Sequence, residues 1–281
     1  MTPLSLDILH LIQSAKIDQA KVLNLSSQNL NAIPFEISEL TALEYLYLSD
    51  NQLTNLPDWI GELTQLKALF VSDNQLSVLP ESIGKLRQLT ELNLSNNQLS
   101  YLPESIGQLT QLQRLSVHAN QLESLPISIG ELQELKYLFL ANNQLRGLPD
   151  SFSQLHQLEE LYLTNNPFTT LPNEIWQLEQ LKDLCLSGNK KITTLPPKIT
   201  QLKNLERLFV ENCQLTQLPQ EITQLTQLKW LYLQDNNLTT LPKGFEELVQ
   251  LNRLDIRKNA IANLSEILNQ MEHPPILSEL G

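Results

Sequence analysis

The chain has few of the residues that metal sites, redox centres and disulfide-stabilised folds use. Its 281 residues include two cysteines and four histidines. Cys185 and Cys213 fall four positions apart on adjacent predicted strands, a separation of roughly 13 Å and too far for a disulfide. The histidines are scattered and do not share the spacing of a metal site: His10, His118, His156 and His273. We therefore expect no metal, no cofactor and two free thiols.

Basic residues are also scarce. There are 19 Lys and Arg against 31 Asp and Glu, which gives a net charge of −12. Nucleic acids and anionic membrane surfaces bind clustered basic side chains, so this balance argues against both as partners. Long apolar runs are missing too, because no stretch reaches the 18 or so residues of a membrane span. The first 15 residues contain no Lys or Arg, and polar residues interrupt their apolar run, so we expect no secretory leader.

What the chain does have is a short internal repeat. Each unit reads LxxLxLxxNxLxxLPxxIxxLxx, and eleven units run from Ala20 to His273. One unit is a residue longer, at Lys190-Lys191. A fixed period in this range is typical of a solenoid, in which each unit stacks on the next and extends one core. Six successive units begin with leucines at this interval: Leu66, Leu89, Leu112, Leu135, Leu158 and Leu181.

Alternating hydrophobicity at positions 3 to 7 of each unit predicts a short strand. In Tyr45-Leu46-Tyr47-Leu48-Ser49 the leucines at positions 4 and 6 would point inward, and positions 3, 5 and 7 outward. Stacking puts equivalent positions side by side, so the strands should form one curved parallel sheet. Proline at position 15 and apolar residues at positions 18 and 21 indicate a return path with a 3₁₀ or short α-helix on the convex side. The expected class is an α/β solenoid of horseshoe shape.

Position 9 is asparagine in most units. A buried amide can donate and accept hydrogen bonds at once, so we expect these side chains to link adjacent turns of the coil. Cys213 occupies this position in one unit and Gln28 in the first. Position 8 carries Asp50, Asp73 and Asp235, which could suggest calcium. Asparagine alternates with them in other units, and both residues favour tight turns, so we predict turn chemistry.

The two ends depart from the repeat, as capping requires. We expect an N-terminal helical cap over residues 1–19, repeats over residues 20–261, and a C-terminal helical cap and tail over residues 262–281. A helix covering the first strand would shield an edge that otherwise invites aggregation. Its predicted apolar face is Leu4, Leu6, Ile8, Leu9, Leu11 and Ile12. The second helix should use Leu264, Ile267, Leu268 and Met271, with Pro274-Pro275 ending it and Ile276 and Leu277 folding back.

These motifs resemble the leucine-rich repeat family. The 23-residue pattern is similar to that of bacterial intracellular repeat proteins, Roco GTPases and plant intracellular Ras-group repeat proteins. The resemblance implies a horseshoe with a protein-binding role, and it names no ligand. Extracellular relatives usually carry disulfide-clamped ends, and this chain has no cysteines there, so the resemblance implies a cytoplasmic location. A Roco protein needs a GxxxxGK[ST] loop, whereas Gly84-Lys85 is followed by Leu86.

Aromatic side chains concentrate at positions 3 and 5, on the outward face of the predicted sheet. Nine of the chain's 16 aromatic residues lie there. Cross-strand packing is one explanation, and a binding surface is the other. The same face holds ten basic and eleven acidic residues at positions 2, 3, 5, 7 and 8, a mixed charge that suits a folded protein or peptide. The predicted partner-binding residues are Tyr45, Tyr47, Phe70, Arg114, Tyr137, Phe139, Tyr162, Arg207, Phe209, Trp230 and Tyr232.

The sequence therefore predicts a non-enzymatic, monomeric module that binds a protein or peptide on its concave face. Some bacterial leucine-rich repeat effectors are cysteine ubiquitin ligases, but their catalytic cysteine lies in a separate helical domain. Cys185 is thus better explained as a small surface filler. One alternative is a regulatory or substrate-recognition segment of a GTPase or ubiquitin ligase whose catalytic part is not in this chain. Another is a structural role, with self-assembly through an end of the coil.

Overall fold

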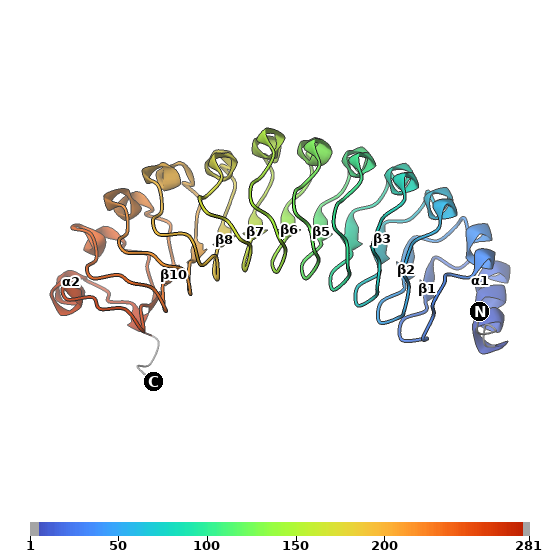
Figure 1. Ribbon diagram of the computed structural model, residues 1–281, viewed down its shortest axis with the longest axis horizontal. Helices are drawn as coiled ribbons and strands as arrows, with labels where there is room; N and C mark the ends of the chain where they lie inside the picture. Colours follow the sequence, from blue (N-terminus) through green and yellow to red (C-terminus); the bar gives the residue numbers. More distant parts are fainter. Residues whose placement is uncertain (1–5, 278–281) are drawn as a thin grey trace. The chain divides into compact units, whose positions relative to one another are not determined.

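The computed structural model describes residues 6–277. The chain divides into two compact units, residues 1–137 and residues 138–281. Each unit repeats one supersecondary element, a short strand followed by a loop and a 3₁₀ helix. Within each unit the strands lie on the concave side and the helices on the convex side (Figure 1).

Parallel strands form the inner layer of both units. In unit 1 they follow chain order as β1 Val22–Asn24, β2 Tyr45–Tyr47, β3 Ala68–Phe70, β4 Glu91–Asn93 and β5 Arg114–Ser116. The boundary between the units falls inside β6, Tyr137–Phe139. In unit 2 they follow as β7 Glu160–Tyr162, β8 Asp183–Cys185, β9 Arg207–Phe209, β10 Trp230–Tyr232, β11 Arg253–Asp255 and β12 Ile276–Leu277.

The strand register follows the repeat. Tyr45 pairs with Ala68, one full period later in the chain, whereas Asp183 pairs with Arg207, which lies one position beyond a full period. The extra residue at Lys190-Lys191 therefore lies in the loop after the strand and does not change the register of the sheet. Each strand covers positions 3 to 5, shorter than the predicted positions 3 to 7. Backbone hydrogen bonds nevertheless continue past the strand, as from Leu48 N to Phe70 O at 2.7 Å.

The convex layer consists of 3₁₀ helices, as predicted. Proline precedes nearly all of them, as Pro80 does with φ −72° and ψ 147°, because this extended geometry needs no backbone donor. The isoleucine in the third position of the helix is fully buried, as at Ile83 and Ile106. The helices are η1 Phe35–Glu39, η2 Asp58–Glu62, η3 Glu81–Lys85, η4 Glu104–Gln108, η5 Ile127–Glu131, η6 Asp150–Gln154, η7 Asn173–Gln177, η8 Pro197–Gln201, η9 Gln220–Gln224 and η10 Phe245–Glu247.

Position 8 of every unit adopts the left-handed conformation where the chain leaves the strand. Asn and Asp tolerate a positive φ better than most residues, and Gly adopts it freely. The predicted turn chemistry is confirmed, and it accounts for most of the residues at this position: Ser27, Asp50, Asp73, Asn96, Ala119, Asn142, Asn165, Gly188, Asn212, Asp235 and Lys258.

The position-9 asparagines link adjacent turns of the coil, as predicted. Asn120 Nδ2 donates to Leu94 O at 3.0 Å in the preceding turn and to Val117 O at 3.1 Å in its own. Its Oδ1 accepts from Leu99 N at 2.9 Å. Asn120 is 7% exposed, so the side chain satisfies backbone groups that water reaches poorly.

Cys213 keeps only part of this pattern. Its Sγ lies 3.5 Å from Leu186 O and from Glu211 O, so a weak donor remains. The donor that an asparagine would accept from is Ile192 N, and this group instead donates to Asn189 O at 3.0 Å across the inserted lysines. With the extra residue in the loop, the Asn189 carbonyl accepts this bond in place of the missing asparagine side chain.

Helices occupy both ends of the described chain. α1 spans Leu6–Ile17 and buries Ile8, Ile12 and Ala15. The predicted apolar face is partly wrong, because Leu6 and Leu11 are 72% and 46% exposed, and Leu4 lies outside the described residues. None of the described helices is both long and apolar enough to cross a membrane.

At the other end, α2 spans Leu264–Gln270, directly ahead of Met271 and the proline pair. Ile267 and Met271 are buried, as the helical spacing predicts. The following residues return as β12, which pairs with β11. Leu277 is half-buried, whereas Ile276 is 73% exposed, so the fold-back covers the core through one of its two apolar residues.

Candidate functional site on the concave strands

The first aromatic cluster lies in unit 1 and comprises Tyr45, Tyr47 and Phe70. Tyr47 and Phe70 occupy the same position on neighbouring strands, and their rings stack with centroids 4.8 Å apart and planes 6° apart. Glu44, beside this cluster, accepts hydrogen bonds from Lys21 and Lys67, both at 2.6 Å. These two ammonium groups hold the pKa of the Glu44 carboxyl below its usual value.

The second predicted cluster falls on the boundary between the units, so its two parts are separate observations. In unit 1, the Arg114 guanidinium lies 4.2 Å from the ring centroid of Tyr137 and also pairs with Glu91 at 3.7 Å. In unit 2, the rings of Phe139 and Tyr162 are 5.1 Å apart and tilted by 39°.

The third cluster lies in unit 2 and comprises Phe209, Trp230 and Tyr232. The rings of Phe209 and Tyr232 stack, with centroids 5.0 Å apart and planes 21° apart. The guanidinium carbons of Arg207 and Arg253 each lie 5.2 Å from the Trp230 ring centroid. Because β9 and β11 flank β10, the indole lies between two cations.

All nine concave aromatic residues are half-buried by their neighbours. Large hydrophobic side chains with more exposure occur at other positions, among them Phe35 at 67% and Tyr101 at 50%. Cross-strand ring contacts account for part of this burial, as between Tyr47 and Phe70 and between Phe209 and Tyr232.

Two carboxylates predicted on the concave surface are buried. Asp183 and Asp255 are each 1% exposed. Arg207 forms an ion pair with Asp183. Arg257 bonds Asp255 through Nε at 2.9 Å and 3.1 Å and through Nη2 at 2.5 Å. Neither carboxylate is therefore available to a partner.

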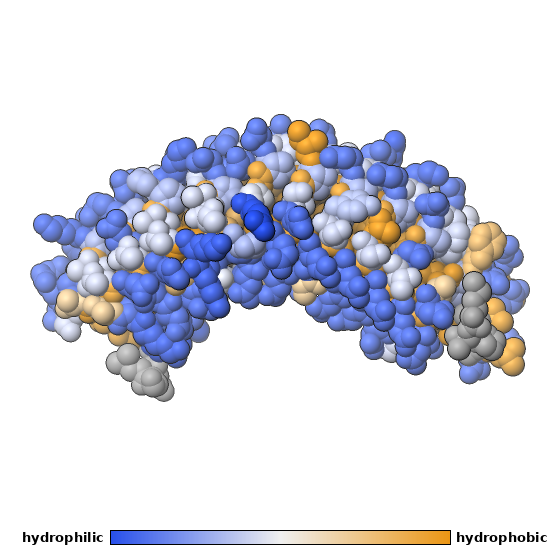
Figure 2. Space-filling model, in the orientation of Figure 1, coloured by the Kyte–Doolittle hydropathy of each residue, from blue (hydrophilic) through white to orange (hydrophobic). Residues whose placement is uncertain are grey.

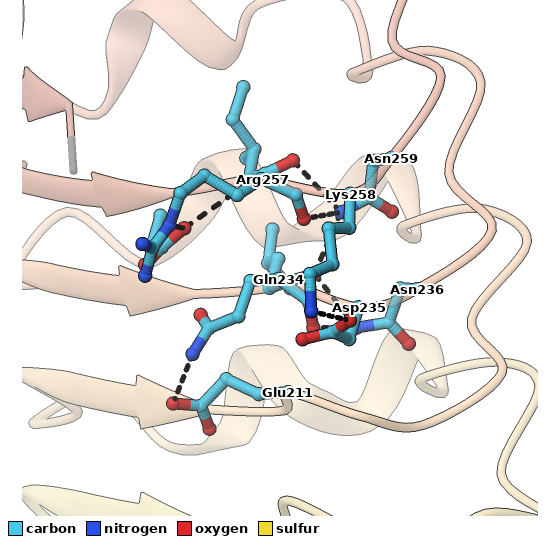
Figure 3. A network of polar contacts seen from close by, with 10 residues as sticks. Glu211, Gln234, Asp235, Asn236, Arg257, Lys258 and Asn259 are labelled. Carbon is cyan, nitrogen blue, oxygen red and sulfur yellow. Dashed lines mark hydrogen bonds and ion pairs between the residues drawn. The ribbon is translucent and has the colours of Figure 1, made fainter. Parts of the chain in front are cut away.

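A row of polar pairs borders the third cluster where the strands end (Figure 3). Gln234 donates to Glu211 at 3.2 Å, and Lys258 pairs with Asp235 at 2.9 Å. Figure 3 shows these side chains beside the asparagine ladder at Asn236 and Asn259. The acidic groups of this border are thus paired within the chain.

The structure gives the cysteines and histidines no shared site. Cys185 Sγ lies 3.0 Å from Thr164 Oγ1 and 3.7 Å from Ser187 Oγ, and neither hydroxyl is a base. Burial raises the pKa of the Cys213 thiol to about 11, so it stays protonated near neutral pH. Burial also lowers the pKa of His118. Within residues 6–277, no three His, Cys, Asp or Glu side chains are placed to hold a metal ion.

A groove of about 820 Å³ opens beside η7 in unit 2, and sequence analysis did not find it. Trp176, which is 1% exposed, stands where several other units have glycine. In those units the helices pack tightly, since a Cβ at Gly61 would lie 2.4 Å from Ser82 O. The groove is lined mainly by amides, among them Gln157 and Gln177. In Figure 2 hydrophilic residues cover most of the visible face, with hydrophobic ones showing between them.

Family models for leucine-rich repeats match most of the chain. The model described as a leucine-rich repeat region matches residues 5–94 and 169–280, and two further repeat models match residues 87–129 and residues 110–168 and 133–191. The chain belongs to the leucine-rich repeat family. Domains of this family commonly mediate protein–protein interaction. A search of curated proteins gave no match.

Solved structures of other leucine-rich repeat proteins share this fold. A TDR receptor is 30% identical, with a TM-score of 0.80, and the match covers 94% of this chain and 48% of the receptor chain. A leucine-rich repeat protein of Leptospira interrogans is 27% identical, with a TM-score of 0.56 and coverage of 95% and 98%. An internalin of Listeria monocytogenes is 19% identical, with a TM-score of 0.75 and coverage of 98% and 91%, and it shows likeness of fold alone.

Proposed function

We propose that this leucine-rich repeat protein is a non-enzymatic interaction module that binds a protein or peptide on its concave strands. The family supports a protein partner, as does the likeness to a solved receptor that is about twice as long as this chain. The observation that carries the proposal is the third cluster, where stacked Phe209 and Tyr232 lie beside Trp230 and two arginines. Tryptophan, tyrosine and arginine are the residues that most often dominate binding energy at interfaces.

Sheet packing alone does not account for these aromatic residues. In unit 1, β4 and β5 hold Glu91, Asn93, Arg114 and Ser116 at the same two positions. These strands pair in the same register as their aromatic neighbours. A strand of this coil therefore forms without rings at positions 3 and 5, and the aromatic clusters represent an addition to what the fold requires.

A capture experiment tests the proposal. The wild-type chain is immobilised beside a Phe209→Ala/Trp230→Ala/Tyr232→Ala variant and a Tyr137→Ala/Phe139→Ala/Tyr162→Ala variant, and each is incubated with lysate of the source organism. A Phe35→Ala/Tyr101→Ala variant removes two exposed aromatic residues away from the concave positions and is the control. We expect a protein that wild type and control retain and that at least one concave variant loses. Identical protein lists from all four, with unchanged circular dichroism, would overturn the proposal.

A further inference from the structure

Arg207 and Arg253 lie on either side of Trp230 and differ in whether a carboxylate of the chain pairs with them. Trp230 is the register partner of both, from β9 on one side and β11 on the other. Arg207 is held by Asp183: its Nε donates a hydrogen bond to Oδ1, and its Nη2 forms an ion pair with the same carboxylate. This buried carboxylate raises the pKa of Arg207 and occupies its donors.

Arg253 has no such partner. Its side chain is exposed, and no carboxylate of residues 6–277 forms an ion pair with it. Its guanidinium instead lies over the Trp230 ring. Stacking on an indole orients the planar guanidinium and leaves its edge donors free.

The acidic groups around this stack already have partners within the chain. Asp183 pairs with Arg207, Asp255 with Arg257, and Asp235 with Lys258. Glu206, on the strand next to Trp230, pairs with Lys229 at 2.8 Å. Glu211 accepts from Ser187 and Gln234 (Figure 3). Arg253 therefore differs from Arg207 in having no ion-pair partner among the described residues, and its guanidinium lies over the Trp230 ring.

We propose that Arg253, oriented by Trp230, binds an aspartate or glutamate side chain of an extended peptide segment. This inference rests on the proposed function and specifies the partner's chemistry. A guanidinium binds a carboxylate through two parallel hydrogen bonds, which fix the geometry of the pair.

The neighbouring aromatic stack specifies a second feature of the segment. Tyr232, which stacks on Phe209, lies two residues along β10 from Trp230, the residue over whose ring the Arg253 guanidinium lies. Two residues of a strand rise about 6.6 Å. This separation matches that of side chains i and i+2 on one side of an extended peptide. The segment that fits therefore carries an acidic and an apolar residue separated by one residue, in either order.

Peptide selection tests this inference. A phage library of random dodecapeptides is panned on the wild-type chain, on Arg253→Gln, and on Lys203→Gln, which removes the same charge beside the convex groove. We expect wild type and Lys203→Gln to enrich peptides with an acidic residue two positions from an apolar one. Arg253→Gln should lose that enrichment.

A synthetic enriched peptide with amidated ends then gives affinities. We expect Arg253→Gln to weaken its binding at least about 10-fold, in line with a lost charge-assisted pair, and a peptide carrying Glu→Gln or Asp→Asn to lose the same factor on wild type. On Arg253→Gln that peptide change should have no further effect. The inference would be overturned if the enriched peptides lacked acidic residues or if no peptide were enriched. It would also be overturned if Arg253→Gln left the affinity unchanged.

If binding also survives the Phe209/Trp230/Tyr232 variant, the proposed function fails as well. If that variant alone abolishes binding, the proposed function stands.

Discussion

At the scale of the residue, the position-9 asparagine hydrogen-bonds backbone groups of two adjacent turns of the coil. Asn120 donates to three carbonyls and accepts from one N–H across two turns. We predict that Asn120→Ala lowers the free energy of unfolding by about 2 to 3 kcal/mol, because it leaves buried backbone groups without partners. Urea unfolding measures the loss, and Gln121→Ala on the exposed neighbour is the control. A loss smaller than the net contribution of one ordinary hydrogen bond would mean that water replaces the amide.

Ala119 offers a second test at this scale, because it holds φ 53° without a side chain suited to it. Asparagine occupies the same position in the two neighbouring units, at Asn96 and Asn142. We predict that Ala119→Asn raises the free energy of unfolding by about 0.5 to 1 kcal/mol, by relieving the left-handed strain. Ala141→Asn makes the same change at position 7, where φ is not positive, and should give no gain. Equal effects at both sites would refute the backbone explanation.

Sequence alone could predict the turn at position 8 and the amide ladder, since both depend on residue type at a fixed place in the period. It could not predict which concave charges are buried. Asp183 and Glu160 are both acidic at position 3, yet the structure buries the first under Arg207. Arg253 was missing from the predicted site for the same reason. Its one sequence signal is that arginine occupies position 3 on both sides of Trp230.

At the scale of the element, the lengthened unit and Cys213 form one feature. Ile192 N donates to Asn189 O because the inserted lysine turns the chain back, and Cys213 offers no carbonyl to accept that bond. We predict that deleting Lys191 or changing Cys213→Asn each destabilises the chain by about 1 to 2 kcal/mol, by leaving a donor or an acceptor unpaired.

The two changes together should restore the regular repeat. The double variant is then expected to recover most of the summed loss, which a double-mutant cycle from thermal or urea unfolding measures as coupling. Additive losses would show that the insertion and the cysteine have no structural connection. Deleting Lys191 while changing Gln214→Asn serves as the unmatched control, since Gln214 is exposed.

The elements were predictable to different degrees. The 3₁₀ helices follow from Pro at position 15 and the buried residue at position 18, which recur in almost every unit. α1 was harder, because its sequence is apolar on more than one side and only packing against the first repeat selects Ile8, Ile12 and Ala15. The groove beside η7 was not predictable, since side chains from three successive units line it, among them Trp176, and the repeat pattern does not give their arrangement.

At the scale of the whole molecule, opposing electrostatic effects set the dependence of stability on pH. The net charge of −12 makes the folded chain repel itself at pH 7, and this repulsion weakens as carboxylates are protonated. Glu44 and Glu104 have the opposite effect, because their protonation lowers the stability of the folded chain. Ammonium groups lower the pKa of Glu44, and hydrogen bonds from Ser128 and Ile127 lower that of Glu104. Their contribution is complete above the pKa of the unfolded chain and is lost as pH falls through the lower folded value.

We therefore predict that the melting temperature rises slightly from pH 7 to pH 5 and falls in more acidic solution, where these two carboxylates become protonated in the folded chain. In Glu44→Gln the melting temperature should fall less in acid, while its rise from pH 7 to pH 5 should be unchanged. Glu123→Gln, at an exposed loop position, removes the same charge and should leave the acid side unchanged. Because repulsion between exposed charges is screened, added salt should reduce the gain more than it reduces the acid-side loss. A melting temperature that falls steadily from pH 7 would mean that paired carboxylates outweigh repulsion throughout.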